Sequence, residues 1–283
     1  MPTTLSYSQL TSARACGERL RLTRLLREDN ASERQAVYLI GGHAFHAATE
    51  RFDKTYFSGP VENPFMLGTD CWWTEWAQAL TEARDAEPDE SKWIVAGKPT
   101  KAKPNAEDVA WWGDAGENWM DAYVEWRELG GWQPFEAPGG LAIEMDINAT
   151  FGEALVRNIL DRAEVTPAGE LVIVDIKTGS KTPDDPTQLA QYAHAFGQVM
   201  DIDAPRWGSY YMARKGAPTP LIDLSSITKE FLDGEYTTLH RMRASGLFLA
   251  NPGWGCGHCG VRDFCAAKGG KRANEYAGRI PDY

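Results

Sequence analysis

Residues whose chemistry could serve a reaction gather in the segment from Leu171 to Tyr192, which reads LVIVDIKTGSKTPDDPTQLAQY. Asp175 and Lys177 are separated by one residue, so in a strand their side chains point to the same face. A carboxylate at a strand end can bind a hard divalent cation, and a lysine beside it can orient a water or neutralise charge on a phosphate. Alone, however, an Asp-x-Lys pair is more often a surface ion pair.

A strand and a helix are expected to position these side chains. Residues 171–174 form an apolar, largely β-branched run after a turn signal, which predicts a buried strand. Turn-forming residues end this strand, and a helix with Pro186 near its first turn is predicted next. Gln188 and Tyr192 are four residues apart, so they share one face of that helix.

Two upstream segments offer further ligands. Residues 154–165 predict a second strand, joined to the first by a short turn, and this hairpin would place Asp161 beside Asp175. His46 lies much earlier, in a helix expected from about Glu33 to Phe57, and Gly42 stands four residues before it. A lone histidine on an apolar helix is usually a core residue, so only this spacing and the downstream carboxylates make His46 a candidate ligand.

Taken in order along the chain, these motifs resemble the RecB-like branch of the PD-(D/E)XK nucleases. The matching residues are Gly42 to His46, Asp161, Asp175 to Lys177, and Gln188 to Tyr192. The resemblance implies an α/β fold with a mixed central sheet flanked by helices, the restriction-endonuclease-like core. A helical insert and a terminal lobe clasped by an iron–sulfur cluster would be added to this core.

The resemblance also implies a role for each matching side chain. The metal ligands would be His46, Asp161, Asp175 and the carbonyl of Ile176. Because imidazole is a softer ligand than oxygen, His46 tilts the preference from Mg²⁺ towards Mn²⁺. Lys177 would position the attacking water, and Gln188 and Tyr192 would orient that water or the scissile phosphate. Glu144, in strands expected over 141–150, is not assigned to the metal shell.

The function implied is metal-dependent hydrolysis of DNA phosphodiester bonds, most often from a chain end. The implied partner is DNA with a free or single-stranded end, and recombination or CRISPR-adaptation proteins are candidate protein partners. Two alternatives stay open. One is a non-catalytic iron–sulfur protein that binds DNA or assists recombination, and the other is a nuclease stabilised by zinc.

The five cysteines suggest a second metal site. Three of them read GCGHCGVRDFC near the C-terminus, a Cys-x2-Cys-x5-Cys pattern whose small neighbours suit chelation by thiolates. This spacing is compatible with zinc or with an iron–sulfur cluster, and either needs a fourth ligand. Cys16, Cys71 and His258 are the candidates that the spacing leaves open.

The resemblance favours one of these candidates. In iron–sulfur members of this nuclease branch, such as AddB-type subunits and CRISPR-associated RecB-like exonucleases, one N-terminal cysteine joins three C-terminal ones around a [4Fe–4S] cluster. The corresponding residues are Cys16, Cys256, Cys259 and Cys265. Gly17 stands where that family often has proline. Cys71 lies outside the pattern and is expected to be an ordinary buried thiol.

Composition limits the class of protein. The chain has 283 residues and a net charge of −11, which argues against broad, non-specific nucleic-acid binding without excluding a nuclease. No apolar run is long enough for a transmembrane helix and no secretory signal opens the sequence, so a cytoplasmic protein is expected. Basic residues gather near both ends. A helix expected near the N-terminus carries Cys16 and then Arg21, Arg24 and Arg27 at helical spacing, and these arginines could face solvent or phosphate.

Three regions are expected from these patterns. Residues 1–30 and 246–283 would form the iron–sulfur lobe, 31–59 and 132–245 the nuclease core, and 60–131 a helical insert. Nine of the eleven tryptophans lie from Trp72 to Trp132. Their helical spacing predicts rings packed between helices rather than a platform on which single-stranded bases stack.

Overall fold

The computed structural model describes residues 4–29, 35–101 and 104–282, and the chain in it divides into two compact units. One unit, called here the cysteine unit, consists of Met1–Glu33, Ile147–Asn158 and Ile227–Tyr283. The other, called the sheet unit, consists of Arg34–Asp146 and Ile159–Ser226. None of the helices in the described ranges combines the length and apolarity needed to cross a membrane.

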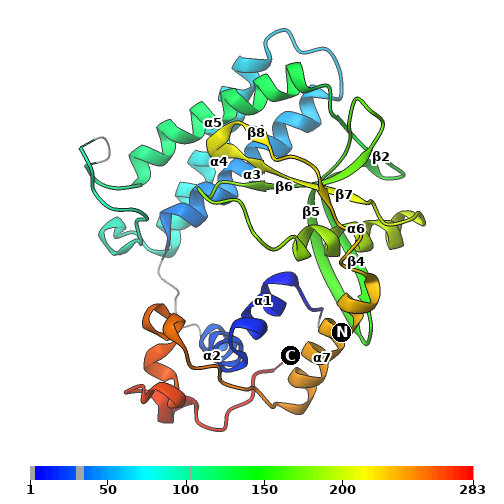
Figure 1. Cartoon of the computed structure of the whole chain (residues 1–283). Helices are drawn as coiled ribbons and strands as arrows, with labels where there is room; N and C mark the ends of the chain where they lie inside the picture. The colour runs from blue at the N-terminus through cyan, green and yellow to red at the C-terminus, as the bar shows by residue number, and fades with distance from the viewer. Residues whose placement is uncertain (1–3, 30–34, 102–103, 283) are drawn as a thin grey trace. The chain divides into compact units, whose positions relative to one another are not determined.

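A seven-stranded mixed sheet is the centre of the fold (Figure 1). Its order is β1-β5-β6-β7-β8, with β4 paired to β5 and β9 to β7. The strands are β1 (Gln133–Pro134), β4 (Ile143–Phe151), β5 (Ala154–Val165), β6 (Leu171–Lys177), β7 (Trp207–Met212), β8 (Ala217–Pro218) and β9 (Ile222–Asp223). β5 and β6 are antiparallel whereas β6 and β7 are parallel, which confirms the mixed sheet. A separate hairpin joins β2 (Glu136–Ala137) to β3 (Gly140–Leu141).

Helices flank this sheet, as the sequence predicts. They are α3 (Val37–Tyr56), α4 (Pro64–Ala86), α5 (Val109–Gly130) and α6 (Thr187–Met200). The start of α3 expected at Glu33 lies outside the described residues. The apolar side chains of β6 at Val172, Val174 and Ile176 belong to the same buried core as α3, α4 and α5. Because side chains alternate along a strand, Asp175 and Lys177 take the opposite face.

The tryptophans of residues 60–131, the segment expected to be an insert, are mainly core residues, which confirms the packing prediction. Trp72, Trp76 and Trp112 are buried, and the rings of Trp72 and Trp76 are stacked with centroids 5.5 Å apart. Glycine makes this close packing possible, since a Cβ built at Gly116 would lie only 2.0 Å from the Trp72 ring. The insert therefore supplies rings that hold α4 and α5 against α3.

The two ends of the chain meet in the cysteine unit, as the cysteine pattern suggests. Its α-helices are α1 (Tyr7–Ala15), α2 (Gly17–Glu28) and α7 (Lys229–Ser245). Four short 3₁₀ helices follow α7: η3 (Trp254–His258), η4 (Arg262–Phe264), η5 (Ala266–Lys268) and η6 (Ala273–Tyr276). A small core joins the N-terminal Leu22 and Leu25 to the C-terminal Val261 and Tyr276.

Two expectations for this end of the chain are wrong. Cys16 does not lie inside a helix, because its extended backbone separates α1 from α2. The break lets the chain near Leu249 approach closely, since a Cβ at Gly17 would lie 2.9 Å from the Leu249 carbonyl oxygen. Arg21 faces neither solvent nor phosphate, because it is buried and donates to the carbonyl oxygens of Tyr276 and Arg279.

Candidate functional site

The β5–β6 hairpin brings Asp161 and Asp175 to the same place, as predicted. Arg162 pairs with Val174, so the preceding Asp161 lies beside the residue that follows Val174. The backbone N–H of Ile176 donates to Asp161 Oδ2 at 2.7 Å, which orients this carboxylate. The role of the Ile176 carbonyl as a metal ligand stays a prediction.

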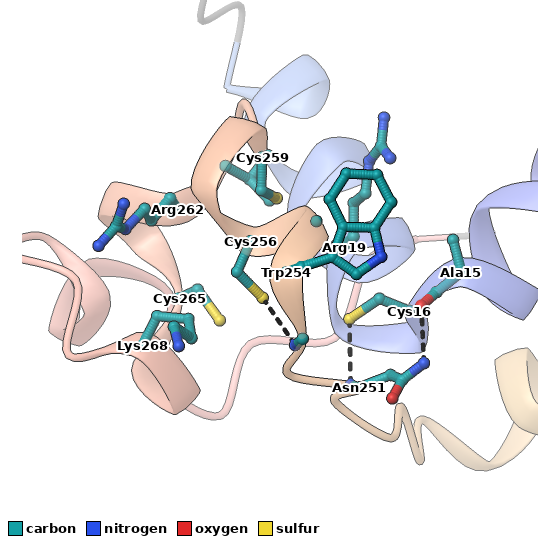
Figure 2. Close-up of a pocket in the computed structure, with 13 residues that line it drawn as sticks. Ala15, Cys16, Arg19, Asn251, Trp254, Cys256, Cys259, Arg262, Cys265 and Lys268 are labelled. Carbon is teal, nitrogen blue, oxygen red and sulfur yellow. Dashed lines mark hydrogen bonds between the residues drawn. The ribbon is translucent and has the colours of Figure 1, made fainter.

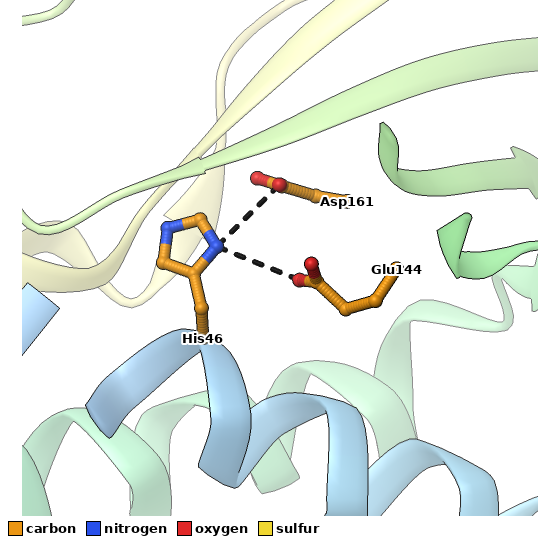
Figure 3. Close-up of side chains that lie close together, drawn as sticks. All are labelled: His46, Glu144 and Asp161. Carbon is orange, nitrogen blue, oxygen red and sulfur yellow. Dashed lines mark ion pairs between the residues drawn. The ribbon is translucent and has the colours of Figure 1, made fainter. Parts of the chain in front are cut away.

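His46 extends from α3 towards two carboxylates (Figure 3). Its Nδ1 lies 3.4 Å from Asp161 Oδ1 and 3.5 Å from Glu144 Oε1. One ligand atom from each of these three residues lies within 4.8 Å of the other two, and no other such trio occurs among residues 4–29, 35–101 and 104–282. One imidazole and two carboxylates are donors that suit Mn²⁺ or Mg²⁺, so the residues fit a divalent cation.

Glu144 is a candidate ligand that the sequence patterns leave unassigned. Its backbone has φ of 49°, a left-handed conformation that is strained for any residue except glycine. This local reversal in β4 turns the carboxylate towards His46, and Arg162 Nη1 contacts the same Glu144 Oε1 at 3.3 Å. An acid in a strand that precedes Asp161 was the available signal, but strand alternation alone does not predict where it points.

The remaining predicted side chains form a connected series beside the trio. Lys177 Nζ lies 2.5 Å from Asp175 Oδ2 and 3.2 Å from Gln188 Oε1. Gln188 Nε2 in turn donates to the Tyr192 hydroxyl at 2.9 Å. Asp175 Oδ2 is buried, and within the described part of the chain it accepts no well-directed hydrogen bond beyond this ion pair. A cation near it would therefore find an available carboxylate oxygen.

Charge at the site alters two pKa values. Burial raises the pKa of Asp175 to about 6, and the neighbouring Asp161 adds to this effect while Lys177 opposes it. Burial by itself would lower the pKa of His46, but the Asp161 and Glu144 carboxylates outweigh it and raise the pKa to about 10. A protonated His46 thus supplies positive charge between two carboxylates when no metal is bound.

A metal must displace this proton, because only neutral imidazole ligates. We therefore expect the wild-type protein at pH 7 to release about one proton for each Mn²⁺ bound, and the affinity to tighten by about tenfold per pH unit up to the His46 pKa of about 10. Calorimetric titrations in buffers of different ionisation enthalpy measure the proton release. His46→Gln is the control and should release far fewer protons for each Mn²⁺ bound. Equal proton release from both proteins would show that His46 is not a metal ligand.

A buried charge network lies behind the trio, and the sequence patterns did not predict it. Arg162 Nε contacts Asp53 Oδ2 at 2.7 Å, and Arg127 contacts both Asp53 and Glu164 at 2.6 and 2.7 Å. All four of these side chains are fully buried. Removing one partner of such a network leaves an uncompensated charge, so the network fixes Arg162 and, through it, Glu144.

A groove of about 500 Å³ adjoins the trio at His46. Its wall includes His43, the half-exposed side chains of Tyr38 and Leu39, and the loop from Thr178 to Ser180 that follows β6. The volume lies in the range of sites for small ligands. A ligand bound in this groove would therefore reach His46.

The cysteine unit contains a second cavity, of about 290 Å³, lined by Cys16, Cys256, Cys259 and Cys265 (Figure 2). Backbone N–H groups of Asn251 and Gly253 donate to the sulfur atoms of Cys16 and Cys256 at 3.3 and 3.4 Å. Four thiol groups therefore line one cavity, but no three of their sulfur atoms lie within 4.8 Å of one another.

The two other candidates for a fourth ligand lie elsewhere. Cys71 belongs to the sheet unit, where it is buried in the core, and burial raises the pKa of its thiol to about 11. It is thus a protonated core thiol, as the sequence predicts. His258 is exposed and is not among the residues that line the cavity.

Comparisons with known proteins cover both sites. The family model of the PD-(D/E)XK nuclease superfamily matches residues 4–266, a range that contains His46, Glu144 and Asp161, the Lys177 series and all four cavity cysteines. The Gene 69 protein of Mycobacterium phage L5 is 28% identical over 286 residues, covering 92% of this chain and 95% of that protein. The Gene 69 protein of Mycobacterium phage D29 is 29% identical over 282 residues, with the same coverage of both chains.

Proposed function

This chain belongs to the PD-(D/E)XK nuclease superfamily, and from that premise we propose that it is a metal-dependent DNA exonuclease of the RecB-like branch with a structural [4Fe–4S] cluster. The observation that carries the nuclease proposal is the convergence of His46, Glu144 and Asp161 within 4.8 Å, beside the Asp175–Lys177 pair. Glu144 joins the predicted ligands in this proposal because its Oε1 faces the same His46 nitrogen as Asp161 does.

The side chains around the trio have different roles in the proposed hydrolysis. A Mn²⁺ or Mg²⁺ ion supplies Lewis-acid stabilisation of phosphate charge and an acidified water when it is bound. The ammonium group of Lys177, whose side chain is 28% exposed, is placed to hold the attacking water or to neutralise charge on a phosphate oxygen. Gln188, itself fixed by Tyr192, holds Lys177 in this orientation.

The groove beside His46 supports a substrate with a single-stranded or frayed end. Its volume of about 500 Å³ is sufficient for a few nucleotide groups of a strand end that enters it. Removal of nucleotides from a strand end needs only such a restricted entrance. We therefore propose a strand end as the substrate, and the length-resolved cleavage assay separates an exonuclease from an endonuclease.

The cavity in the cysteine unit supports the iron–sulfur cluster over a single zinc ion. Zinc with Zn–S bonds of about 2.3 Å would draw four sulfur atoms around one point. Here the four cysteines instead line a space of about 290 Å³, which has room for several metal and sulfide ions. The ends of the chain meet at this cavity, so the proposed role of the cluster is structural.

Incubation with end-labelled DNA tests the proposed activity. Single- and double-stranded DNA are supplied with Mg²⁺ or Mn²⁺, and the products are resolved by length, with the label placed at either end in separate reactions. An exonuclease releases mononucleotides or very short products from one end from the earliest times. Binding without any cleavage would instead favour the accessory role, and fragments of many lengths would indicate an endonuclease.

The two histidines of α3 provide a matched pair for testing the metal site. His46→Ala is expected to lower the rate of cleavage by about tenfold or more and to reduce the preference for Mn²⁺ over Mg²⁺, because the imidazole ligand is lost. His43 lines the same groove but belongs to no such trio within the described residues, so His43→Ala should retain the parental metal preference. Cleavage rates measured over a range of Mn²⁺ and Mg²⁺ concentrations test this expectation. Equal effects of the two substitutions would show that His46 is not a metal ligand.

A further inference from the structure

Trp254, the first residue of η3 in the cysteine unit, has an exposed ring that the packing of this unit does not explain. Its side chain is 92% exposed, the largest value for a large hydrophobic residue in the described part of the chain. The tryptophans of the sheet unit show the opposite pattern, since Trp72 and Trp112 are almost wholly buried. An indole that contributes so little to the core is available for contact with another molecule.

Three cations line the same cavity as Trp254 (Figure 2): Arg19, Arg262 and Lys268. Within the described residues, none of the three has a carboxylate within ion-pair distance, and no Asp or Glu lines this cavity. This local composition is unusual in a chain whose net charge is −11. It creates a positive region around the exposed ring.

Other arginines of the cysteine unit are already paired. Carboxylate partners are found for Arg14 with Glu235, Arg24 with Glu28, Arg272 with Glu275 and Arg279 with Asp29. The folded unit therefore neutralises its cations where it can, but leaves those around Trp254 without carboxylates. A negatively charged ligand is the simplest partner for such a set.

We propose that Trp254, Arg19, Arg262 and Lys268 form a binding site for single-stranded DNA on the cysteine unit. An exposed aromatic face with unpaired cations beside it is the arrangement that binds single strands, because bases stack on the ring while phosphates contact the cations. An apolar protein surface would suit the ring but would desolvate the cations without pairing them. In taking DNA as the ligand, this inference rests on the proposed function.

The cations alone could also offset the negative charge of cysteine thiolates, so the test centres on the ring. Binding of a fluorescein-labelled oligothymidylate is measured by anisotropy with the full-length protein in EDTA, where metal-dependent cleavage does not occur. Trp254→Ala is expected to weaken binding by about tenfold or more, whereas Trp254→Phe, which keeps a stacking face, should remain within about threefold of the wild type. Leu247→Ala is the matched control, because Leu247 is also highly exposed but has no ring.

Two further measurements separate the outcomes. Arg19→Gln combined with Arg262→Gln should reduce the slope of log affinity against log salt concentration by about 1.4, the value for two phosphate contacts on a single strand. Iron content and absorption should be unchanged in Trp254→Ala. If Trp254→Ala bound the oligothymidylate with wild-type affinity, the proposal would be overturned. The same holds if Trp254→Ala bound more weakly but had also lost its iron, because the weaker binding would then reflect the lost cluster. Failure of the wild-type protein to bind or cleave any DNA would instead overturn the proposed function itself.

Discussion

Asp175→Asn is expected to lower the rate of DNA cleavage by about a thousandfold or more while leaving the protein folded. The substitution keeps the size of the side chain but removes the charge that attracts a divalent cation and pairs with Lys177 at 2.5 Å. Stability should not fall much, because burial and the nearby Asp161 already raise the pKa of this carboxyl to about 6. A neutral amide relieves both unfavourable effects.

The effect of Asp175→Asn on stability should depend on pH. A carboxyl whose pKa is raised in the folded state destabilises that state above its unfolded pKa of about 4, and the cost reaches its full size above the folded value of about 6. In the absence of metal, Asp175→Asn should therefore melt at or above the wild-type temperature at pH 7, with the difference vanishing towards pH 4. Thermal unfolding in EDTA at the two pH values measures it.

Cleavage assays of the same variant need a matched control. Asp203→Asn changes the same residue type at an exposed position after α6, so its rate should equal that of the wild type. Lys177→Ala is expected to act at the same step as Asp175→Asn, because Lys177 contacts both Asp175 and Gln188. If purified Asp175→Asn still degrades DNA at the parental rate with Mn²⁺, the assignment of the active site is wrong.

The parts of the site that could be predicted are those encoded by local patterns. β5 runs from Ala154 to Val165, the range expected from the sequence, because its apolar and polar residues are bounded by clear turn signals. The register of the β5–β6 hairpin then places Asp161 next to Asp175. A shift of this register by one residue would turn every buried side chain of a strand to the opposite face, so the register is strongly specified. Helical spacing likewise placed Gln188 and Tyr192 on one face of α6.

The parts that could not be predicted depend on contacts between distant residues or on an unusual backbone. Glu144 reaches His46 because its φ is 49°, and no sequence pattern for a strand includes that reversal. Asp53 and Arg127 are 74 residues apart and lie in helices, where charged side chains are normally expected at the surface. Their burial becomes understandable only when Arg162 and Glu164 complete the network.

Cys16→Ser is expected to lose the iron of the protein and to destabilise the cysteine unit. Three closely spaced cysteines cannot complete a four-ligand shell, and serine is a poor ligand for a cluster that thiolates hold. The apolar cluster that joins the two ends of the chain has only four buried residues, so a metal cross-link between them should matter greatly. By comparison with other links that close loops of more than a hundred residues, its loss should cost about 4 kcal/mol.

Cys71→Ser is the control for this prediction. Cys71 is buried in the core of the sheet unit and is not among the residues that line the cysteine cavity, so its replacement should leave the metal content unchanged. Anaerobically purified wild-type and Cys71→Ser proteins should both be brown, absorb broadly near ~400 nm and contain about four irons per chain. Stoichiometric zinc without iron in the wild-type protein would favour a zinc-stabilised nuclease.

The comparison of Cys16→Ser with Cys71→Ser tests whether a cluster joins the N- and C-terminal segments of the cysteine unit. Cys16 lies at the break between α1 and α2, and the N–H of Asn251 donates to its sulfur at 3.3 Å, so both chain ends already contribute to its surroundings. If Cys16→Ser loses iron and unfolds at lower temperature while Cys71→Ser does neither, Cys16 is the fourth ligand. A Cys16→Ser protein with full iron and stability, beside a Cys71→Ser protein that lacks both, would reassign the ligand and remove the cross-link from the cysteine unit.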